Sequence, residues 1–229
     1  MTKMIFQPTA QVSVPIFGKQ DHFPVHRIYC VGRNYEAHAR EMGKDPTREA
    51  PFFFLKPADT LVMTGTPIKY PPRTNNFHHE IELVVAIGKD GANISSANAL
   101  EFVYGYAVGN DLTRRDLQLQ ARDKGRPWCT GKSFEQCASI TAIYPAESVG
   151  HLSKGRIWLT VNGEKRQDSD ISLLIWNVPE IIADLSTYYN LRAGDLIYTG
   201  TPEGVGPLKP GDKIEGGIDG LTTLVNTIV

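Results

Sequence analysis

The sequence has little cysteine and no excess of either charge. Three cysteines occur among 229 residues, with no CxxC pair and no even set, so neither a disulfide framework nor a structural zinc site is encoded. This cysteine usage is typical of a reducing cytoplasm. Lys and Arg number 24 against 25 Asp and Glu, which gives a net charge of -1. A general nucleic-acid-binding protein would show a basic excess or stripe, so the composition argues against that class.

Long apolar runs are also missing. Near the N-terminus, Gln7, Pro8 and Gln11 interrupt the apolar residues before they reach signal-peptide length, and no later segment is as long as a membrane span. We therefore expect no targeting or transmembrane segment. No repeat, low-complexity tract or Ser/Gly linker divides the chain, and its length is enough for a sizeable core. We expect an N-terminal extension over residues 1–25 and a single domain over residues 26–229.

The sequence does contain many short apolar and β-branched runs separated by turns. Its 21 Gly and 15 Pro residues indicate frequent turns. Strands are predicted over residues 26–31, 52–56, 80–87, 102–110, 156–161, 164–168 and 195–199, and two more around Asp219–Gly220. Helices are predicted over residues 34–42, capped by Asn34, over residues 113–124, with Asp111 near the cap, and over residues 178–189, with Pro179 in the first turn. Without regular βαβ alternation, this balance predicts a strand-rich α+β fold with a β-roll or β-sandwich core.

The first candidate site is a set of three carboxylates, Glu80, Glu82 and Asp111. Glu80 and Glu82 share one face at the head of a predicted strand, because alternate residues of a strand point the same way. Asp111 follows the next strand. Oxygen-only ligands favour Mg²⁺, Mn²⁺ or Ca²⁺ over zinc. The structural alternative is a solvated edge strand. However, residues 83–87 are apolar without alternation, as in a strand buried on both faces, where two carboxylates would repel each other unless a cation lay between them.

A candidate general base lies on the first predicted helix. His38 and Glu41 are three positions apart, so they are neighbours on a helix surface. Glu41 could accept a hydrogen bond from one imidazole nitrogen while the other nitrogen takes a proton from water. By itself this spacing is weak evidence, since most such pairs are merely exposed helix residues.

Other polar groups suit an anionic substrate. Arg115, Gln118 and Lys132 follow the second carboxylate-bearing strand, although surface Arg and Lys are usually only solvated. The segment Thr199–Pro207 predicts a tight loop after a strand. This loop lacks the Gly-Lys-Ser/Thr ending of a phosphate-binding loop, and its prolines remove backbone donors. Its remaining N–H groups and the Thr201 hydroxyl could still bind a carboxylate.

In combination, these motifs resemble the fumarylacetoacetate hydrolase superfamily. The matching segments are Tyr29–Tyr35, His38–Glu41, Phe54–Pro57, His79–Leu83, Asn110–Thr113, Lys132–Phe134 and Thr199–Pro207. They occur in order from about Ile28 to the C-terminus, and seven ordered motifs are far more specific than any one of them. Arg27–Tyr35, His38–Gly43 and Pro51–Phe54 are most similar to members that hydrolyse fumarylpyruvate in the gentisate route.

The resemblance implies a β-roll of the C-terminal-domain type with a divalent metal, usually Mg²⁺ or Mn²⁺, on Glu80, Glu82 and Asp111, with Ca²⁺ as a substitute in crystals. It also implies a His38–Glu41 dyad on a lid, and usually a homodimer. Implied substrate contacts come from Arg115, Gln118, Lys132 and Thr201. Larger members add an N-terminal domain and a further Asp ligand ahead of the catalytic His, for which this chain has no counterpart. We therefore expect water or substrate to complete the metal's ligands.

The implied reaction is hydrolysis of the C–C bond of an acylpyruvate, with 3-fumarylpyruvate and water giving fumarate and pyruvate. The 1-carboxylate and 2-oxo oxygens of such a substrate form a natural chelate for a hard cation. His38, oriented by Glu41, would take a proton from the water that attacks the distal carbonyl, and Lys132 would add positive charge near the departing enolate. The far carboxylate of the fumaryl group should meet a cation, for which Arg33 and Arg114 are the candidates on proximity to the motifs alone.

Two alternatives stay open. The same scaffold with a differently placed acid or base would decarboxylate a β-keto acid such as oxaloacetate, or isomerise a dienol such as 2-hydroxyhepta-2,4-dienedioate. His38 and Glu41 favour hydrolysis, because water activation needs a base. A non-catalytic module with a structural cation would not need these two residues and Lys132 as well. The expected partners are a small acylpyruvate substrate and a second copy of the chain, with no nucleic acid and no membrane.

Overall fold

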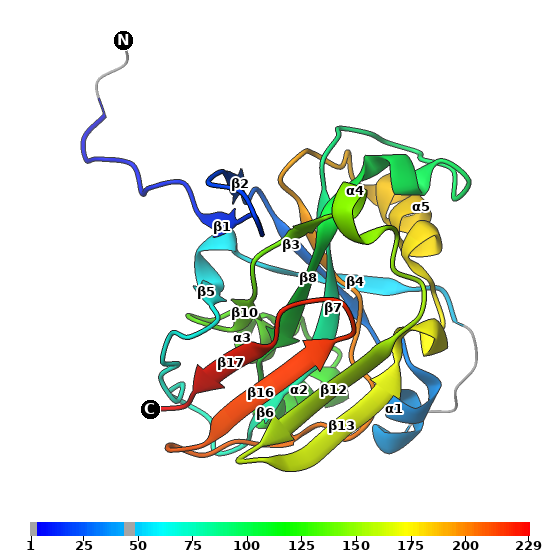
Figure 1. The fold of residues 1–229 in the computed structure, drawn as a ribbon. Coiled ribbons are helices and arrows are strands. Elements are labelled where there is room, and N and C mark those ends of the chain that lie inside the picture. The colour runs from blue at the N-terminus through cyan, green and yellow to red at the C-terminus, as the bar shows by residue number, and fades with distance from the viewer. Residues whose placement is uncertain (1–3, 44–48) are drawn as a thin grey trace.

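The structure is a computed structural model, and it describes residues 4–43 and 49–229. Its centre is a mixed, curled sheet of eight strands, onto which a four-stranded antiparallel sheet packs (Figure 1). The large sheet runs β4 (Phe52–Lys56), β3 (Ile28–Gly32), β14 (Leu196–Tyr198), β7 (Ile81–Ile87), β8 (Val103–Asp111), β10 (Ala138–Ile140) and β5 (Leu61–Met63), with β11 (Tyr144–Pro145) paired to β8. The small sheet runs β13 (Glu164–Asp170), β12 (Arg156–Val161), β16 (Lys213–Ile218) and β17 (Leu224–Thr227). This architecture confirms the predicted strand-rich α+β fold.

Short strands and helices complete the structure. A third sheet contains β15 (Gly206–Pro207), β6 (Phe77–His79) and β9 (Thr113–Arg114), and β1 (Ser13–Pro15) pairs with β2 (His22–Pro24). The α-helices are α1 (Glu36–Glu41), α2 (Arg115–Asp123), α3 (Cys129–Lys132), α4 (Ala146–Val149) and α5 (Val178–Tyr188). Three 3₁₀ turns are η1 (Ala58–Thr60), η2 (Ala99–Phe102) and η3 (Ile171–Leu173). No helix among the described residues is both long and apolar enough to cross a membrane.

Strand β7 is the axis of the core. All seven of its residues are buried, as its unbroken apolar run predicts. Leu83 and Val85 belong to the hydrophobic cluster shared with the four-stranded sheet and α5. Val84 and Ala86 belong to a second cluster, on the side of the β1–β2 hairpin. Each fully buried aliphatic side chain of this size contributes roughly 1.5–3 kcal/mol, so the strand that carries the candidate ligands is held on both faces.

Local sequence signals set the hairpin and the longest helix. Asn162 and Gly163 both have positive φ (54° and 80°) in the turn between β12 and β13, as a tight hairpin requires. At the start of α5, Asn177 Oδ1 accepts a hydrogen bond from the Glu180 N–H (3.0 Å), and Glu180 Oε2 accepts one from the Asn177 N–H (3.0 Å). Pro179 lies between the two residues of this capping box, in the first turn of the helix. Both elements confirm their prediction.

The predicted cap of the first helix is wrong. α1 begins at Glu36, and no side chain caps it. Asn34 is instead buried, and its amide donates to the carbonyls of Trp176 (2.9 Å) and Thr199 (2.8 Å). Its oxygen accepts from the Trp176 N–H at 2.7 Å. A buried amide must satisfy all its polar atoms, and these long-range partners use the oxygen that a cap would need.

The predicted cap of the second helix is wrong for a related reason. Asp111 ends β8, and Leu112 and the two residues of β9 separate it from the start of α2 at Arg115. The Asp111 carboxylate is buried in ion pairs with lysines, as described below, and is therefore not available to helix N–H groups.

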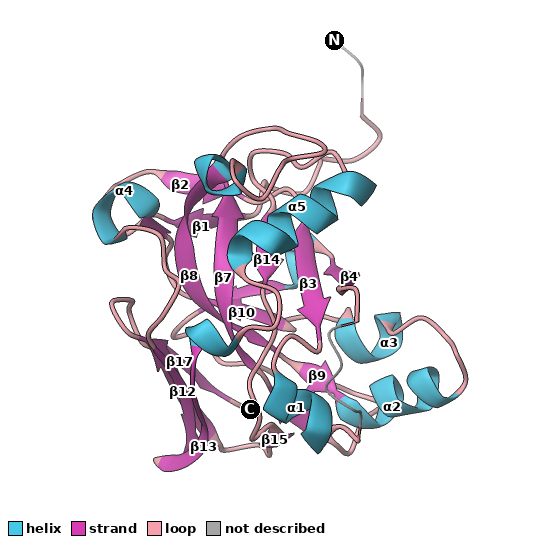
Figure 2. Ribbon diagram, turned by 90° about the vertical axis from the view of Figure 1, so that its right-hand side faces the viewer, coloured by secondary structure: helices cyan, strands magenta, loops and turns pink. Residues whose placement is uncertain are grey.

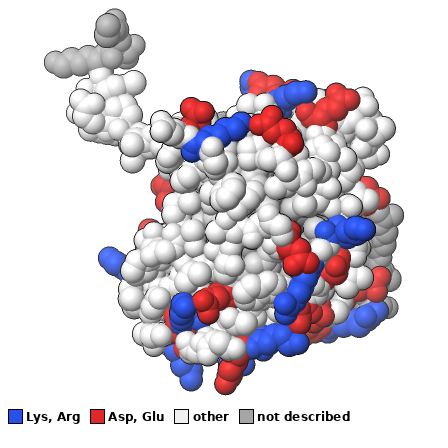
Figure 3. All heavy atoms as spheres, in the orientation of Figure 1, with Lys and Arg blue, Asp and Glu red and all other residues white. Residues whose placement is uncertain are grey.

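The helices α1, α2 and α3 gather at one end of the molecule, near β9 and β15 (Figure 2). This is the end where β7 begins and β8 finishes, since the two strands are antiparallel. The face seen in Figure 3 shows basic and acidic side chains interspersed, with no broad patch of one sign.

Candidate metal centre and active site

The three predicted carboxylates meet where β7 begins and β8 ends. Ile81 pairs with Asn110, which places Glu80 opposite Asp111. The Asp111 N–H donates to the Glu80 carbonyl (2.8 Å), and the Asn110 side-chain oxygen accepts from the Glu80 N–H (2.8 Å). Each carboxylate of Glu80, Glu82 and Asp111 offers an oxygen within 4.8 Å of the others, and all three residues are buried. The strand pairing therefore builds the predicted cluster directly.

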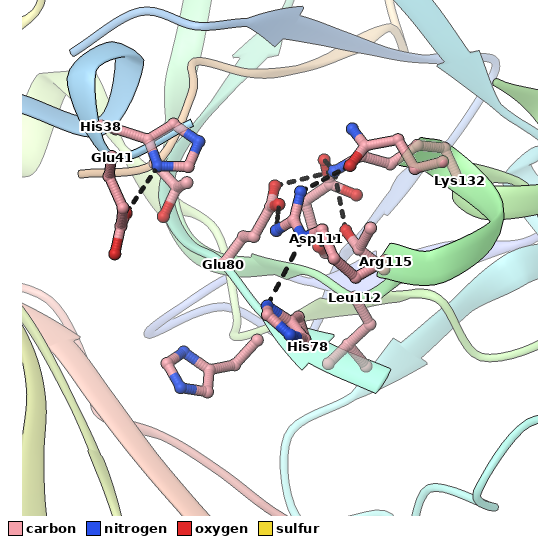
Figure 4. Close-up of polar contacts among 12 residues, drawn as sticks. His38, Glu41, His78, Glu80, Asp111, Leu112, Arg115 and Lys132 are labelled. Atoms are coloured by element: carbon pink, nitrogen blue, oxygen red, sulfur yellow. Dashed lines mark hydrogen bonds and ion pairs between the residues drawn. The ribbon is translucent and has the colours of Figure 1, made fainter. Parts of the chain in front are cut away.

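Two predicted cations bind the first of these carboxylates (Figure 4). Lys132 Nζ lies 2.7 Å from Glu80 Oε2, from Asp111 Oδ2 and from the Thr113 hydroxyl. The Arg115 guanidinium pairs with the other Glu80 oxygen. Burial alone would raise the pKa of Glu80, but Lys132 and Arg115 outweigh it and hold the pKa well below its usual range. Glu80 is therefore ionised at any working pH.

Glu82 has a different environment. Its Oε2 accepts a hydrogen bond from the Gly200 N–H at 2.8 Å, but no ion pair to Glu82 occurs among the described residues. Burial, together with the Asp111 and Glu80 carboxylates, raises the pKa of Glu82 well above its usual range. The raised pKa indicates that the cations of the protein do not neutralise this buried carboxylate. The all-carboxylate donor set fits Mg²⁺ or Mn²⁺, so these three residues would hold the metal.

Lys56, which sequence reasoning missed, is a further cation of the site. Its Nζ lies 2.7 Å from Asp111 Oδ1 and donates to the carbonyls of Leu112 (3.3 Å) and Lys132 (2.5 Å). Burial alone would lower the pKa of Lys56, but the Asp111 carboxylate outweighs it, and the pKa lies above its ordinary value. The available signal was a lysine at the end of an apolar strand, directly before Pro57.

The predicted dyad is formed. His38 Nδ1 and Glu41 Oε2 are 3.1 Å apart on α1, and the Glu41 carboxylate also accepts from the Gly204 N–H (3.1 and 3.2 Å). Burial would raise the pKa of Glu41, but the hydrogen bonds from His38 and Gly204 outweigh it and lower the pKa. Figure 4 shows the imidazole between Glu41 and the carboxylate cluster. The second imidazole nitrogen is therefore left for chemistry inside the site.

A cavity of about 40 Å³ joins these groups. Every predicted site residue except Glu41, which lies behind His38, and Arg114 lines it: Arg33, His38, Glu80, Glu82, Asp111, Arg115, Gln118, Lys132 and Thr201. The volume is close to that of one or two waters.

The structure corrects one of the two cations predicted for a distal carboxylate. Arg114 does not line the cavity; its guanidinium stacks on Phe134 (4.3 Å to the ring centre) and donates to the Thr130 carbonyl. Arg33 does line it. So does Arg122, which sequence reasoning missed.

Arg122 and Arg33 reach the cavity from different settings. Arg122 lies seven residues after Arg115 on α2, and that helical spacing was the signal that could have found it. Arg33 has a positive φ of 55°, and its guanidinium lies 5.2 Å from the centre of the Phe52 ring.

His78 supports Arg115 from outside the cavity. Its Nδ1 accepts from Arg115 Nε at 3.4 Å, and its Nε2 bonds to Asn76 Oδ1 at 2.7 Å. Burial and the Arg115 charge lower the pKa of His78 to about 4, so it is neutral at pH 7 and can accept this hydrogen bond. These contacts give His78 a structural role.

The fold and the site define a class of protein that binds one hard divalent cation on buried carboxylates, beside a His–Glu pair, at one end of a curled mixed sheet. The family model for the fumarylacetoacetate hydrolase C-terminal domain matches residues 27–229. The chain belongs to the fumarylacetoacetate hydrolase family.

Three relatives illustrate the match. The chain is 54% identical over 184 residues to a fumarylpyruvate hydrolase of Ralstonia sp., covering 80% of this chain and 95% of that one. It is 44% identical over 197 residues to a mitochondrial oxaloacetate tautomerase of Homo sapiens, covering 86% and 89%. The crystal structure of fumarylpyruvate hydrolase from Pseudomonas aeruginosa with Mn²⁺ and pyruvate has a TM-score of 0.97 and 54% identity, and covers 99% of both chains.

Proposed function

We propose that the protein is a metal-dependent hydrolase that cleaves the C–C bond of acylpyruvates, with 3-fumarylpyruvate and water as reactants and fumarate and pyruvate as products. The observation that carries the proposal is the His38–Glu41 pair in the same cavity as the three carboxylates. Relatives named fumarylpyruvate hydrolase, one of them solved with Mn²⁺ and pyruvate, support it.

The charges around the cavity favour an anionic substrate. Three carboxylates face three buried cations, Lys56, Lys132 and Arg115, so the protein groups alone are close to neutral. A divalent cation then brings a surplus of two positive charges into a buried site. A chelating 2-oxo carboxylate cancels one of these charges at binding and the second when it becomes an enolate.

Each residue has a role in the proposed reaction. Glu80, Glu82 and Asp111 would hold Mg²⁺ or Mn²⁺, which would supply Lewis acidity to the 2-oxo acid end of the substrate. His38, oriented by Glu41, takes a proton from water, whose oxygen bonds to the distal acyl carbonyl carbon.

The remaining steps release the two products. As the tetrahedral carbon collapses, its bond to C3 of the pyruvoyl unit breaks, and that electron pair becomes an enolate beside Lys132. A proton returned to C3 gives pyruvate, and the acyl half leaves as the acid. Arg115, Gln118 and Thr201 bind the pyruvoyl end, and Arg33 faces the acyl end.

A coupled assay tests the proposal. The Mn²⁺-loaded or Mg²⁺-loaded protein is incubated with fumarylpyruvate, and pyruvate is followed with a lactate dehydrogenase couple. Stoichiometric fumarate and pyruvate are expected, and EDTA should abolish their release. Absence of pyruvate release with either metal refutes the proposal.

A second candidate is conversion of oxaloacetate. The 44% identical oxaloacetate tautomerase favours it, because enolisation of this β-keto acid needs the same chelate. The same protein is therefore given oxaloacetate, with the enol followed by its ultraviolet absorbance and pyruvate by the coupled assay. Conversion of oxaloacetate faster than fumarylpyruvate would make this second candidate the main activity.

The finer assignments belong to the same proposal. We propose that the catalytic unit spans residues 26–229, uses Mg²⁺ or Mn²⁺, acts as a homodimer and serves aromatic catabolism through gentisate in the cytoplasm. The three cysteines are free, which agrees with a reducing compartment. Light scattering on the metal-loaded protein gives its mass directly, and a monomer would contradict the homodimer.

A further inference from the structure

Gln167 is a buried amide that links the four-stranded sheet to the candidate site. It lies on β13 and is fully buried. Its oxygen accepts from the Ile81 N–H (3.1 Å) and faces His79 Nδ1 (3.0 Å). Its nitrogen donates to the Thr201 hydroxyl oxygen (2.8 Å) and to the Pro202 carbonyl (2.9 Å). All four hydrogen-bonding positions of the amide are therefore used.

The two backbone contacts fix which way this amide points. The Ile81 N–H can only donate, so the amide oxygen must face it. The Pro202 carbonyl can only accept, so the amide nitrogen must face that side. It follows that His79 donates from Nδ1 to Gln167, and that Gln167 donates to the hydroxyl oxygen of Thr201.

The direction of this chain determines what Thr201 can do. A threonine hydroxyl has one proton, and here its oxygen already accepts a hydrogen bond from Gln167. No hydrogen bond donated by the Thr201 hydroxyl occurs among the residues that the structure describes, and Thr201 lines the cavity. Its proton is therefore available to an anion inside the cavity.

We propose that Gln167 is a positioning residue that keeps the Thr201 hydroxyl oriented as a donor toward the carboxylate of a bound 2-oxo acid. This inference rests on the proposed function for the nature of the ligand. The same amide contacts His79 and Ile81, the two residues on either side of Glu80. It therefore also fixes the distance between the strand that carries a metal ligand and the loop that carries Thr201.

A double-mutant cycle tests the inference with oxalate as probe. Oxalate binding to the Mn²⁺-loaded protein is measured by calorimetry for the wild type, Gln167→Met, Thr201→Val and the double variant. A hydrogen bond to a charged group corresponds to about a 10–100-fold change in affinity, so each single variant should lose about that much. The double variant should lose at most about threefold more than the worse single variant.

The controls separate positioning from general damage. Asn226 is a second buried amide, bonded to Ser139 and to the carbonyls of Met63 and Thr66, away from the cavity. Asn226→Leu should lower the thermal stability without changing oxalate affinity. Thr201→Ser keeps the hydroxyl and should bind oxalate within about threefold of the wild type. Mn²⁺ affinity without oxalate should change by less than about threefold in Gln167→Met.

If Gln167→Met does not fold, Gln167→Glu replaces it. The carboxylate keeps an acceptor for Ile81 but takes the Thr201 proton for itself, so oxalate affinity should fall as in Thr201→Val. The inference is overturned if the double variant loses the product of the two single-variant losses in oxalate affinity. It is also overturned if the Gln167 variant binds oxalate as tightly as the wild type. A wild type that binds oxalate but releases no pyruvate from fumarylpyruvate overturns the proposed function alone.

Discussion

Replacing Glu82 by Gln should make the metal-free protein more stable while abolishing its metal binding. The substitution keeps the shape of the side chain and an oxygen that can accept from the Gly200 N–H. It removes a carboxylate whose pKa is raised well above the usual range by burial and by its acidic neighbours. Because the folded pKa is raised, Glu82 contributes no destabilisation well below the unfolded value of about 4.3, and its penalty grows as the pH rises above it.

The magnitude follows from the cluster geometry. Two unit charges separated by at most 4.8 Å repel by about 3.5 kcal/mol or more at an effective dielectric constant of about 20. Glu82 faces two such neighbours, but Lys132 and the other buried cations attract it and offset much of this repulsion. We expect a net stabilisation of about 1–3 kcal/mol at pH 7, which corresponds to a rise of roughly 2–10 °C in the melting temperature.

The assay is thermal and denaturant unfolding in EDTA and in excess Mn²⁺. Wild-type protein should gain stability from the metal, about 2.7 kcal/mol at a concentration 100 times its dissociation constant, whereas Glu82→Gln should gain none. Glu80→Gln is the matched control, because Glu80 already pairs with Lys132 and Arg115. Breaking these buried ion pairs should cost about 3–5 kcal/mol in EDTA.

The two neighbouring substitutions should therefore change metal-free stability in opposite directions. If Glu82→Gln is less stable than the wild type in EDTA at pH 7, repulsion within the cluster is not what Glu82 experiences. If the difference in stability between Glu82→Gln and the wild type does not increase from pH 5 to pH 8, the raised pKa of Glu82 is refuted as its cause.

Four further substitutions test other parts of the site. His38→Ala should lower kcat by about 10²–10⁴-fold with unchanged Mn²⁺ affinity, measured by steady-state kinetics and metal titration; near-normal kcat would remove His38 from the mechanism. Arg33→Leu or Arg122→Leu should lower kcat/KM at least about tenfold for fumarylpyruvate but leave acetylpyruvate, which lacks the distal carboxylate, nearly unaffected; equal losses on both substrates would contradict a role at the acyl end. Gly204→Ala should lower the free energy of unfolding by more than about 2 kcal/mol, measured by denaturant unfolding. Gly204 has a φ of +89°, and the new Cβ would lie 2.0 Å from the Arg166 carbonyl oxygen. Wild-type stability would show that this loop adapts.

The elements with strong local signals were predictable from the sequence. The Asn162–Gly163 turn, the capped helix α5 and the apolar strand β7 each depend on residues close together in the chain. The metal cluster was predictable for the same reason, since Glu80 and Glu82 share one strand face and Asp111 ends the next strand. Ordered motifs extended this to the family.

The unpredicted parts depend on contacts between distant segments. Asn34 looks like a helix cap locally, but its amide bonds to Trp176 and Thr199. Lys56 ends β4 and Asp111 ends β8. These residues are 55 positions apart in the chain, and the curled sheet brings them into contact. Such partners give no local periodicity, so only the three-dimensional arrangement assigns them.

The Glu41 carboxylate orients His38 and also binds the Gly204 N–H of the loop after β14. In the proposed mechanism, this one side chain therefore both fixes α1 to the loop and orients the proton acceptor. His38 and Glu41 both lie on α1, so movement of the helix away from that loop would break the Gly204 contact and would carry the base out of the site together with its orienting carboxylate. In the proposed reaction, water that entered the opened site would therefore meet no base, and no separate device would be needed to prevent its premature activation.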